Sequence, residues 1–157
     1  MEWMLLPLRR YAQFSGRSRR KEYWMFLLFC VIARFVLTII DNILGFNFTL
    51  GLNPVGPRLG LLAGLFALAT FIPSLAVGVR RLHDTDRSGW WMLAVLVAIL
   101  PGAVLMAVNL VVGMAAIAVG ALGASILLIV YMCQDGTRGD NRYGPDPKSP
   151  DLADVFA

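Results

Sequence analysis

The chain has 157 residues, of which 58% are hydrophobic and 15% charged, with a formal net charge of +4 and a mean hydropathy of +0.69. Soluble domains are typically ~45–50% apolar and ~25% charged, so this composition excludes an ordinary soluble enzyme and is typical of a membrane protein. The length allows one domain and leaves no room for a separate soluble catalytic unit.

Four apolar stretches follow one another along the chain. A helix needs ~20 mostly apolar residues to cross a bilayer, and the sequence predicts spans at about 23–44, 59–79, 90–109 and 113–133. The last two come from a stretch without any charged residue, 90–133, which is too long for one helix. Asn109 and Gly113 mark the turn between them, because Asn and Gly tolerate left-handed backbone conformations.

The sequence therefore predicts an all-α polytopic membrane protein with four transmembrane helices in a compact bundle. Its parts are a basic juxtamembrane segment at 1–22, a membrane domain at 23–134 with a polar elbow at 80–89, and a tail at 135–157. Twelve of the fourteen basic residues lie in the first segment, the elbow and the tail. By the positive-inside rule, both termini and the elbow are expected in the cytoplasm.

Two charged residues lie within the first span. Arg34 is near mid-bilayer, where an arginine costs roughly 2.5–3.5 kcal/mol, and Asp41 lies seven residues further along the same helix face. One interpretation is a buried polar seam that joins Arg34 and Asp41 to Thr70, Ser74 or Asn109. The other is that Arg34 snorkels to the membrane surface while Asp41 sits at the outer interface.

Small residues and prolines indicate how the helices pack. An i, i+4 spacing of small residues permits close helix contact, and it occurs at Gly60 and Gly64 and again at Ala116, Gly120 and Ala124. Pro73 and Pro101 each interrupt a span and are expected to bend it, because proline removes one backbone hydrogen bond.

Three polar segments flank the spans on the predicted cytoplasmic side: FSGRSRRKEYW at 14–24, RRLHDTDRSGWW at 80–91 and DGTRGDNRYGPDP at 135–147. Because the helix ends of a four-helix bundle lie within one bundle diameter, we expect these segments to form a single cytoplasmic cap. Its candidate binding residues are Arg17, Arg20, Glu22, Arg80, Arg81, His83, Asp84, Ser88, Trp90, Asn141, Arg142 and Asp146.

Specific contacts are expected inside the cap. Arg80 and Asp84 are spaced to pair on a continuing helix, and Glu22 or Asp146 can pair with Arg80 or Arg81. Ser88 is placed to cap the third span. The turn residues of NRYGPDP predict a rigid loop, in which Arg142 and Asp146 dock against opposite charges of the elbow.

The segments GRSRRKEYW, RRLHDTDRSGWW and GDNRYGPDP, in this order between apolar spans, resemble the DUF805 family of bacterial inner-membrane proteins. The resemblance runs from about Tyr11 to Pro147. One departure is Asp86, where the family more often carries a small residue such as glycine. The resemblance implies a small multi-span inner-membrane protein of unassigned biochemical function and supplies no mechanism.

Four functions are compatible with these residues. The first is structural or regulatory interaction within the membrane, with lipid, a membrane protein or a second copy as partner. The second is binding of anionic lipid headgroups or phosphate groups by the cap arginines, because guanidinium groups match phosphate geometry. The third is a small-solute transporter or channel subunit that uses Arg34 and Asp41.

The fourth function is a membrane-embedded enzyme with His83 as general base. No catalytic constellation accompanies this histidine in the sequence, so no catalytic residue is assigned. One histidine and two cysteines are too few for a zinc site, and no metal or cofactor is expected. The basic cluster at 17–21 is too close to the membrane to favour nucleic acid.

Overall fold

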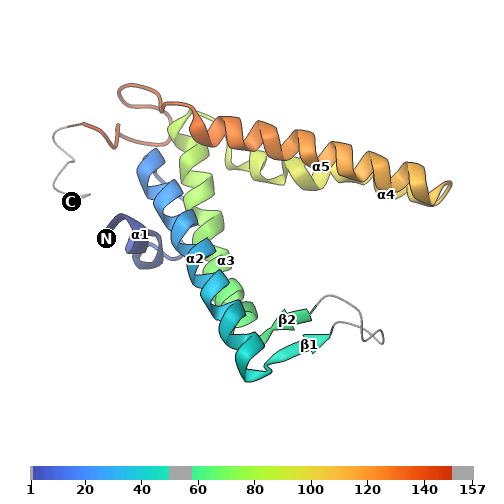
Figure 1. Ribbon diagram of the computed structural model, residues 1–157. Coiled ribbons are helices and arrows are strands. Elements are labelled where there is room, and N and C mark those ends of the chain that lie inside the picture. The colour runs from blue at the N-terminus through green and yellow to red at the C-terminus, as the bar shows by residue number, and fades with distance from the viewer. Residues whose placement is uncertain (1, 50–57, 150–157) are drawn as a thin grey trace. The chain divides into compact units, whose positions relative to one another are not determined.

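A computed structural model describes residues 2–49 and 58–149 of the chain (Figure 1). Its elements are α1 (Glu2–Arg9), α2 (Arg20–Leu44), β1 (Asn47–Thr49), β2 (Arg58–Gly60), α3 (Leu61–Asp84), the 3-10 helix η1 (Gly89–Leu93), α4 (Ala94–Met106) and α5 (Leu110–Cys133). Parts of the predicted outer loop and tail, at 50–57 and 150–157, lie outside the described residues.

Four helical stretches are long and apolar enough to cross a membrane: α2, α3, η1 together with α4, and α5. The all-α architecture with four transmembrane helices is thereby confirmed, and their packing into one bundle stays a prediction. The chain forms two compact units, one of residues 1–13 and 21–77 and the other of residues 14–20 and 78–157, and α3 runs through both.

Two helix boundaries differ from the predicted ones. α3 continues to Asp84, so the first residues of the expected elbow form its last turn. The carbonyl groups that end this helix are paired: the backbone amide of Asp86 donates to the His83 carbonyl, and the amide of Thr137 donates to that of Asp84. Because helix ends need partners for such carbonyls, the polar segments around them stabilise the extra turn.

The turn between α4 and α5 is also displaced from its predicted position. Asn109 caps α5, since its side-chain oxygen accepts a hydrogen bond of 3.1 Å from the amide of Val112. Gly113, predicted as a turn residue, instead lies inside α5. A Cβ atom there would be 2.5 Å from the backbone nitrogen of Met106. This glycine is thus needed for close helix contact, and the prediction of its role was wrong.

Glycines bring α4 and α5 together along their length. A Cβ on Gly102 would lie 2.6 Å from the backbone nitrogen of Ile117, and one on Gly120 would lie 2.3 Å from the Ala98 carbonyl oxygen. Both helices are apolar on all sides, so small residues rather than an amphipathic stripe set their contact. The structure confirms Gly120 as a contact residue, whereas Gly60 lies in β2 and not in a transmembrane helix.

In the other unit, α2 and α3 lie side by side and are joined by the antiparallel pair β1–β2, in which Asn47 is opposite Gly60 (Figure 1). Asp41, near the end of α2, is completely buried. Its two carboxylate oxygens accept hydrogen bonds of 3.0 and 2.9 Å from the backbone amides of Leu62 and Ala63. Asp41 therefore caps the first turn of α3, where a negative charge is favourable.

Replacing Asp41 with alanine is expected to lower the free energy of unfolding by about 1–2 kcal/mol, the upper part of the range for a lost helix cap. The buried amides of Leu62 and Ala63 would lose their acceptors. Thermal unfolding in detergent measures the loss. The neighbouring Asn42→Ala is the control. Asn42 is exposed, and among the described residues its side chain donates to the carbonyl of Thr38 and accepts from Asn47. Equal effects of the two substitutions would contradict the capping role.

Candidate functional site

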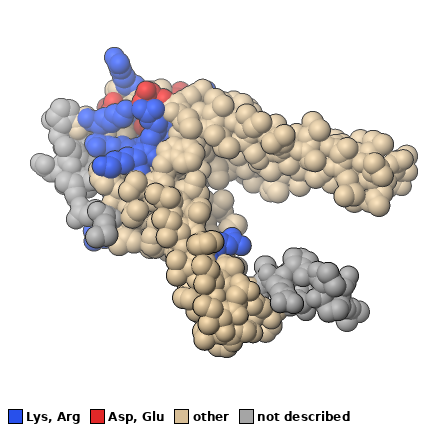
Figure 2. All heavy atoms as spheres, viewed as in Figure 1, with Lys and Arg blue, Asp and Glu red and all other residues tan. Residues whose placement is uncertain are grey.

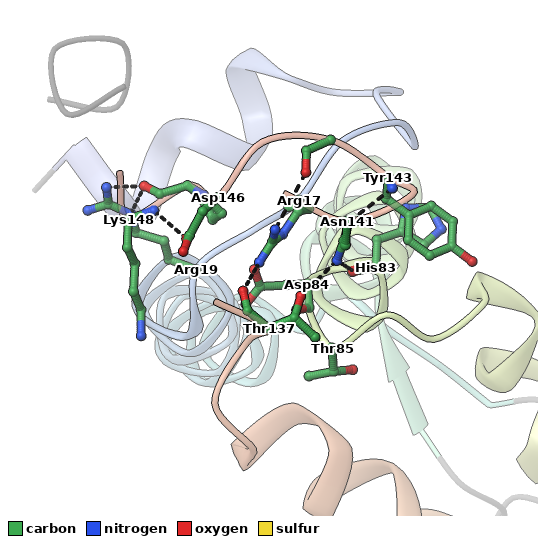
Figure 3. Close-up of polar contacts among 12 residues, drawn as sticks. Arg17, Arg19, His83, Asp84, Thr85, Thr137, Asn141, Tyr143, Asp146 and Lys148 are labelled. Atoms are coloured by element: carbon green, nitrogen blue, oxygen red, sulfur yellow. Dashed lines mark hydrogen bonds and ion pairs between the residues drawn. The ribbon is translucent and has the colours of Figure 1, made fainter. Parts of the chain in front are cut away.

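Three segments distant in sequence form one polar cluster, which we call the polar cap: residues 14–20, 78–88 and 134–148, all within one compact unit. Arg17 connects them (Figure 3). Its Nε lies 3.0 Å from Oδ1 of Asp84, and its terminal nitrogens donate to the carbonyls of Thr137 (2.5 Å) and Gly139 (2.6 Å). The guanidinium thus joins the N-terminal segment to the end of α3 and to the tail. The structure confirms that the three segments meet.

Arg81 is the second buried guanidinium of the polar cap. It forms an ion pair with Asp84, donates to the carbonyl of Met132 at 3.1 Å and also donates to the carbonyl of Gln134. These two carbonyls lie at the C-terminal end of α5, where the backbone has unpaired acceptors and a partial negative charge. Arg81 therefore holds the end of α5 against the last turn of α3.

Asp84 lies between the two arginines and is almost fully buried. The predicted pairing of Asp84 with Arg80 was wrong: its ion pairs in the described part of the chain go to Arg17 and Arg81. Arg81, three residues before Asp84 on the same helix, is one of its partners. The backbone carbonyl of Arg80 accepts a hydrogen bond from the amide of Ser18. Gly136 faces the carboxylate, and a Cβ there would be 2.1 Å from Oδ2 of Asp84.

His83 has a defined position in the polar cap. Its Nδ1 is 3.2 Å from the carbonyl oxygen of Gly16, and because a carbonyl can only accept, this nitrogen carries the proton. The imidazole stacks on the ring of Tyr143, with centroids 3.8 Å apart and planes 3° from parallel. The backbone oxygen of His83 accepts a hydrogen bond of 2.9 Å from the side chain of Asn141. These contacts fix the histidine in place between two segments.

The tail loop is stabilised by its own hydrogen bonds as well as by the elbow. The backbone amides of Lys148 and Gly139 donate to the carboxylate of Asp146 and lower its pKa. Asp146 thus closes the loop on itself, and the prediction that it docks on the elbow was wrong. The prediction for Arg142 was right, since its Nε lies 3.1 Å from Oδ1 of Asp86.

The backbone conformation at Asp86 explains why aspartate can replace the small residue that is more frequent in the family at this position. Its φ angle is +55°, in the left-handed region that favours glycine and tolerates aspartate and asparagine better than other residues. The carboxylate at this position adds the ion pair with Arg142, which also donates to the Asp86 carbonyl at 2.7 Å. Both side chains are about half exposed, so this ion pair lies at the surface of the polar cap.

The aromatic end of the elbow borders the apolar helices. Ser88 caps η1, accepting a hydrogen bond from the amide of Trp90, as predicted. Trp90 is 78% exposed, and Trp91 contacts the ring of Tyr131 edge-on. The guanidinium of Arg87 lies 4.0 Å from the centroid of Tyr131. Exposed tryptophans beside an arginine are typical of the depth of lipid headgroups.

The remaining candidates of the N-terminal segment and of α3 have different surroundings. Arg20 is exposed and donates to the carbonyl of Cys133 at 3.1 Å, besides pairing with Asp135 at 2.6 Å. Glu22 and Arg80 are each 1% exposed. Glu22 belongs to the first turn of α2 in the other compact unit, and its predicted pairing stays a prediction.

The polar seam predicted around Arg34 is absent from the described residues. Arg34 is exposed on α2, and its guanidinium has no hydrogen bond or ion pair within the described part of the chain. Asp41 is engaged at the start of α3, while the hydroxyl groups of Thr70 and Ser74 donate to carbonyls of their own helix. Arg34 instead lines an open groove of about 310 Å³ between α2 and α3.

Sequence reasoning missed several cap residues. Gly136 carried no signal, because its need for a glycine depends on the approach of Asp84 from another helix. Tyr143 lies within the quoted tail motif, but a single sequence does not indicate that its ring stacks on His83. Gly16 acts through its backbone carbonyl, which any residue type supplies. Thr137 acts through its backbone and also through its hydroxyl, which donates to the Asp84 carbonyl and accepts from Asn141.

Comparison with known proteins places this geometry in a family. A family model described as "Protein of unknown function (DUF805)" matches residues 11–145, which include all three segments of the polar cap up to Pro145. The chain belongs to the DUF805 family.

This DUF805 protein is similar to "Inner membrane protein YhaH" of Escherichia coli (strain K12), with 39% identity over 148 residues, 94% of this chain and 98% of the relative. It is 40% identical to "Inner membrane protein YhaI" of the same organism over 94% of this chain and 97% of the relative. "Uncharacterized protein YiiR" is 29% identical over 140 residues, 85% of this chain and 84% of the relative. No solved structure matches the chain. With its four membrane-length helices, the protein is a multi-pass protein of the bacterial inner membrane.

Proposed function

We propose that this DUF805 protein acts by contact with other membrane components, and that the polar cap is a rigid cytoplasmic platform for those contacts rather than a catalytic pocket. The observation that carries this proposal is that the buried guanidinium groups already have hydrogen-bond partners within the chain. Arg17 and Arg81 direct their guanidinium groups at Asp84 and at backbone carbonyls of the same chain. Groups that are already paired stabilise the fold and are not available to a ligand.

The surroundings of His83 also favour a structural role. Its Nδ1–H donates to the Gly16 carbonyl, which fixes the orientation of the ring. The ring face is covered by Tyr143. Stacking and hydrogen bonding of this kind join two cap segments, which is the property expected of a platform.

A double-mutant cycle tests the structural role of His83. His83→Ala and Tyr143→Ala are each expected to lower the free energy of unfolding by about 1–2 kcal/mol, with a coupling of roughly 0.5–1.5 kcal/mol between them. The reason is that either substitution removes the same stacked pair. Thermal unfolding of the four proteins in detergent gives the coupling. Additive effects, or a fully stable His83→Ala protein that has lost an activity, would refute the structural assignment.

Anionic headgroup binding is the second candidate. Its support is the exposed Arg138 of the polar cap and the exposed Trp90 of the adjoining helix η1. The compact unit that contains the polar cap carries nine basic against five acidic residues among those described. In Figure 2, Lys and Arg gather on the part of the surface formed by the polar cap, and the surface of α4 and α5 carries none. Basic residues next to a membrane attract anionic lipid.

The buried Arg81 is unsuitable for testing this second candidate, because its loss would damage the fold. The informative variant combines Arg138→Ala with Arg142→Ala, both at exposed positions. Headgroup binding requires that this variant retains less phosphatidylglycerol than the original protein in native mass spectrometry from mixed nanodiscs. Val119→Ala, on the exposed face of α5, is the control. Equal retention by all three proteins would exclude this exposed part of the polar cap as a headgroup site.

A further inference from the structure

Pro73 leaves one backbone carbonyl of α3 without a donor from its own helix. Pro73 lies inside α3 and is fully buried. Because proline has no N–H, the carbonyl four residues earlier, that of Ala69, loses its intrahelical donor. In hydrocarbon no water is present to replace that donor. The hydroxyl of Tyr11 takes its place, donating to the Ala69 carbonyl oxygen at 2.8 Å.

The position of Ala69 along α3 sets the depth of this contact. The apolar part of α3 ends near Val79, ten residues after Ala69, which corresponds to about 15 Å at 1.5 Å per residue. The hydrocarbon core of a bilayer is about 30 Å thick. A hydroxyl bonded to Ala69 therefore lies near the middle of the membrane, far from the water phase in which a basic N-terminal segment was expected.

The rest of the N-terminal segment is suited to such a position. α1 carries an apolar run, WMLLPL, and its Pro7 is fully buried. Lys21 of α2 places its ammonium group 5.4 Å from the ring centroid of Trp3. Figure 1 shows α1 beside α2. The long side chain of Arg9 is exposed and can extend toward the headgroups, as arginines near a membrane surface commonly do.

We propose that residues 2–13 form a membrane-inserted arm that docks on α3 at Pro73, and that Tyr11 supplies the hydrogen-bond donor that Pro73 lacks. The arm and the proline then depend on each other. Pro73 frees the Ala69 carbonyl that binds the arm, and the bound arm satisfies this carbonyl in hydrocarbon. This inference is independent of the role proposed for the polar cap, because none of its contacts involves a residue of that cluster.

A double-mutant cycle between Tyr11 and Pro73 tests the docking. Tyr11→Phe removes only the hydroxyl and is expected to shift the unfolding equilibrium roughly three- to tenfold toward the unfolded form, the range for a hydrogen bond within a membrane protein. Pro73→Ala restores the backbone N–H, so Tyr11→Phe in that background should have an effect of less than about twofold. Tyr143→Phe is the matched control and should have the same effect in both backgrounds. An equal effect of Tyr11→Phe in both backgrounds would overturn the docking.

The depth of the arm is measured separately, in case a cycle variant folds poorly. A spin label is attached to Ala12→Cys in a protein whose Cys30 and Cys133 are replaced by serine, reconstituted in phosphatidylcholine vesicles. Its relative accessibility to oxygen and to a water-soluble nickel chelate should resemble that of a label at the lipid-facing Leu68, beside Ala69. A label at the exposed Asp140 gives the value for water. A value at position 12 equal to that at position 140 would refute the insertion.

Discussion

Asparagine in place of Asp84 is expected to abolish the folded polar cap. The substitution keeps the shape of the side chain and removes its charge, which leaves the guanidinium groups of Arg17 and Arg81 buried beside a neutral amide. Their side chains are 1% and 0% exposed. Breaking a buried ion pair by removing one partner costs about 3–5 kcal/mol, a large part of the stability of a domain of this size.

The measurement is the yield of monodisperse protein in detergent, followed by the midpoint of thermal unfolding of what remains. Asp86→Asn is the control, because Asp86 makes the same kind of ion pair with Arg142 at the surface. There the expected loss is at most about 1 kcal/mol. An Asp84→Asn protein as stable as the control would show that the buried charges are not what holds the three segments together.

Alanine at Gly120 is expected to separate α4 from α5. Its Cβ would lie 2.3 Å from the carbonyl oxygen of Ala98, a backbone atom that can only move with its helix. Overpacking of this kind costs about 1–3 kcal/mol, and the contacts at Gly102 and Gly113 along the same interface should weaken with it. Thermal unfolding in detergent and disulfide cross-linking between cysteines placed on α4 and α5 measure the loss.

Gly123→Ala provides the matched control in the same helix. A Cβ at Gly123 meets no atom within 4 Å, and alanine is a better helix former than glycine by about 1 kcal/mol. This variant should therefore be as stable as the original protein or more so. If Gly120→Ala were stabilised to the same extent as Gly123→Ala, the close approach of the two helices would be disproved.

The number and length of the membrane spans could be predicted because they depend on composition alone. Four apolar stretches of the right length must become helices, since only helical backbone satisfies its own hydrogen bonds in hydrocarbon. The turn before α5 was misplaced by a few residues, because Gly113 suits a turn and a close helix contact equally well. The choice between them depends on Met106, a residue of the facing helix.

The membership of the polar cap was also largely predictable, whereas its pairing was not. Polar segments at helix ends on one side of the membrane have to cluster. The predicted residues Arg17 and Arg81 both pair with Asp84, and Asn141 donates to the carbonyl of His83, the residue before Asp84. The sequence did not indicate that Arg81 rather than Arg80 would be the partner of Asp84. Both are within one helical turn of it, and only the position of the α5 carbonyls decides between them.

For Asp41 and Arg34, too, the sequence indicated the position on the helix but not the contacts. Their shared helix face suggested one polar seam, but Asp41 is used by the first amides of α3 and Arg34 lines an open groove. By itself, the amino-acid sequence determined the class of protein, the four spans and the segments that gather at their ends, since hydropathy and charge are additive along a chain. Tertiary structure alone decided which donor meets which acceptor, because hydrogen bonds and ion pairs require contact within a few ångströms between residues far apart in sequence.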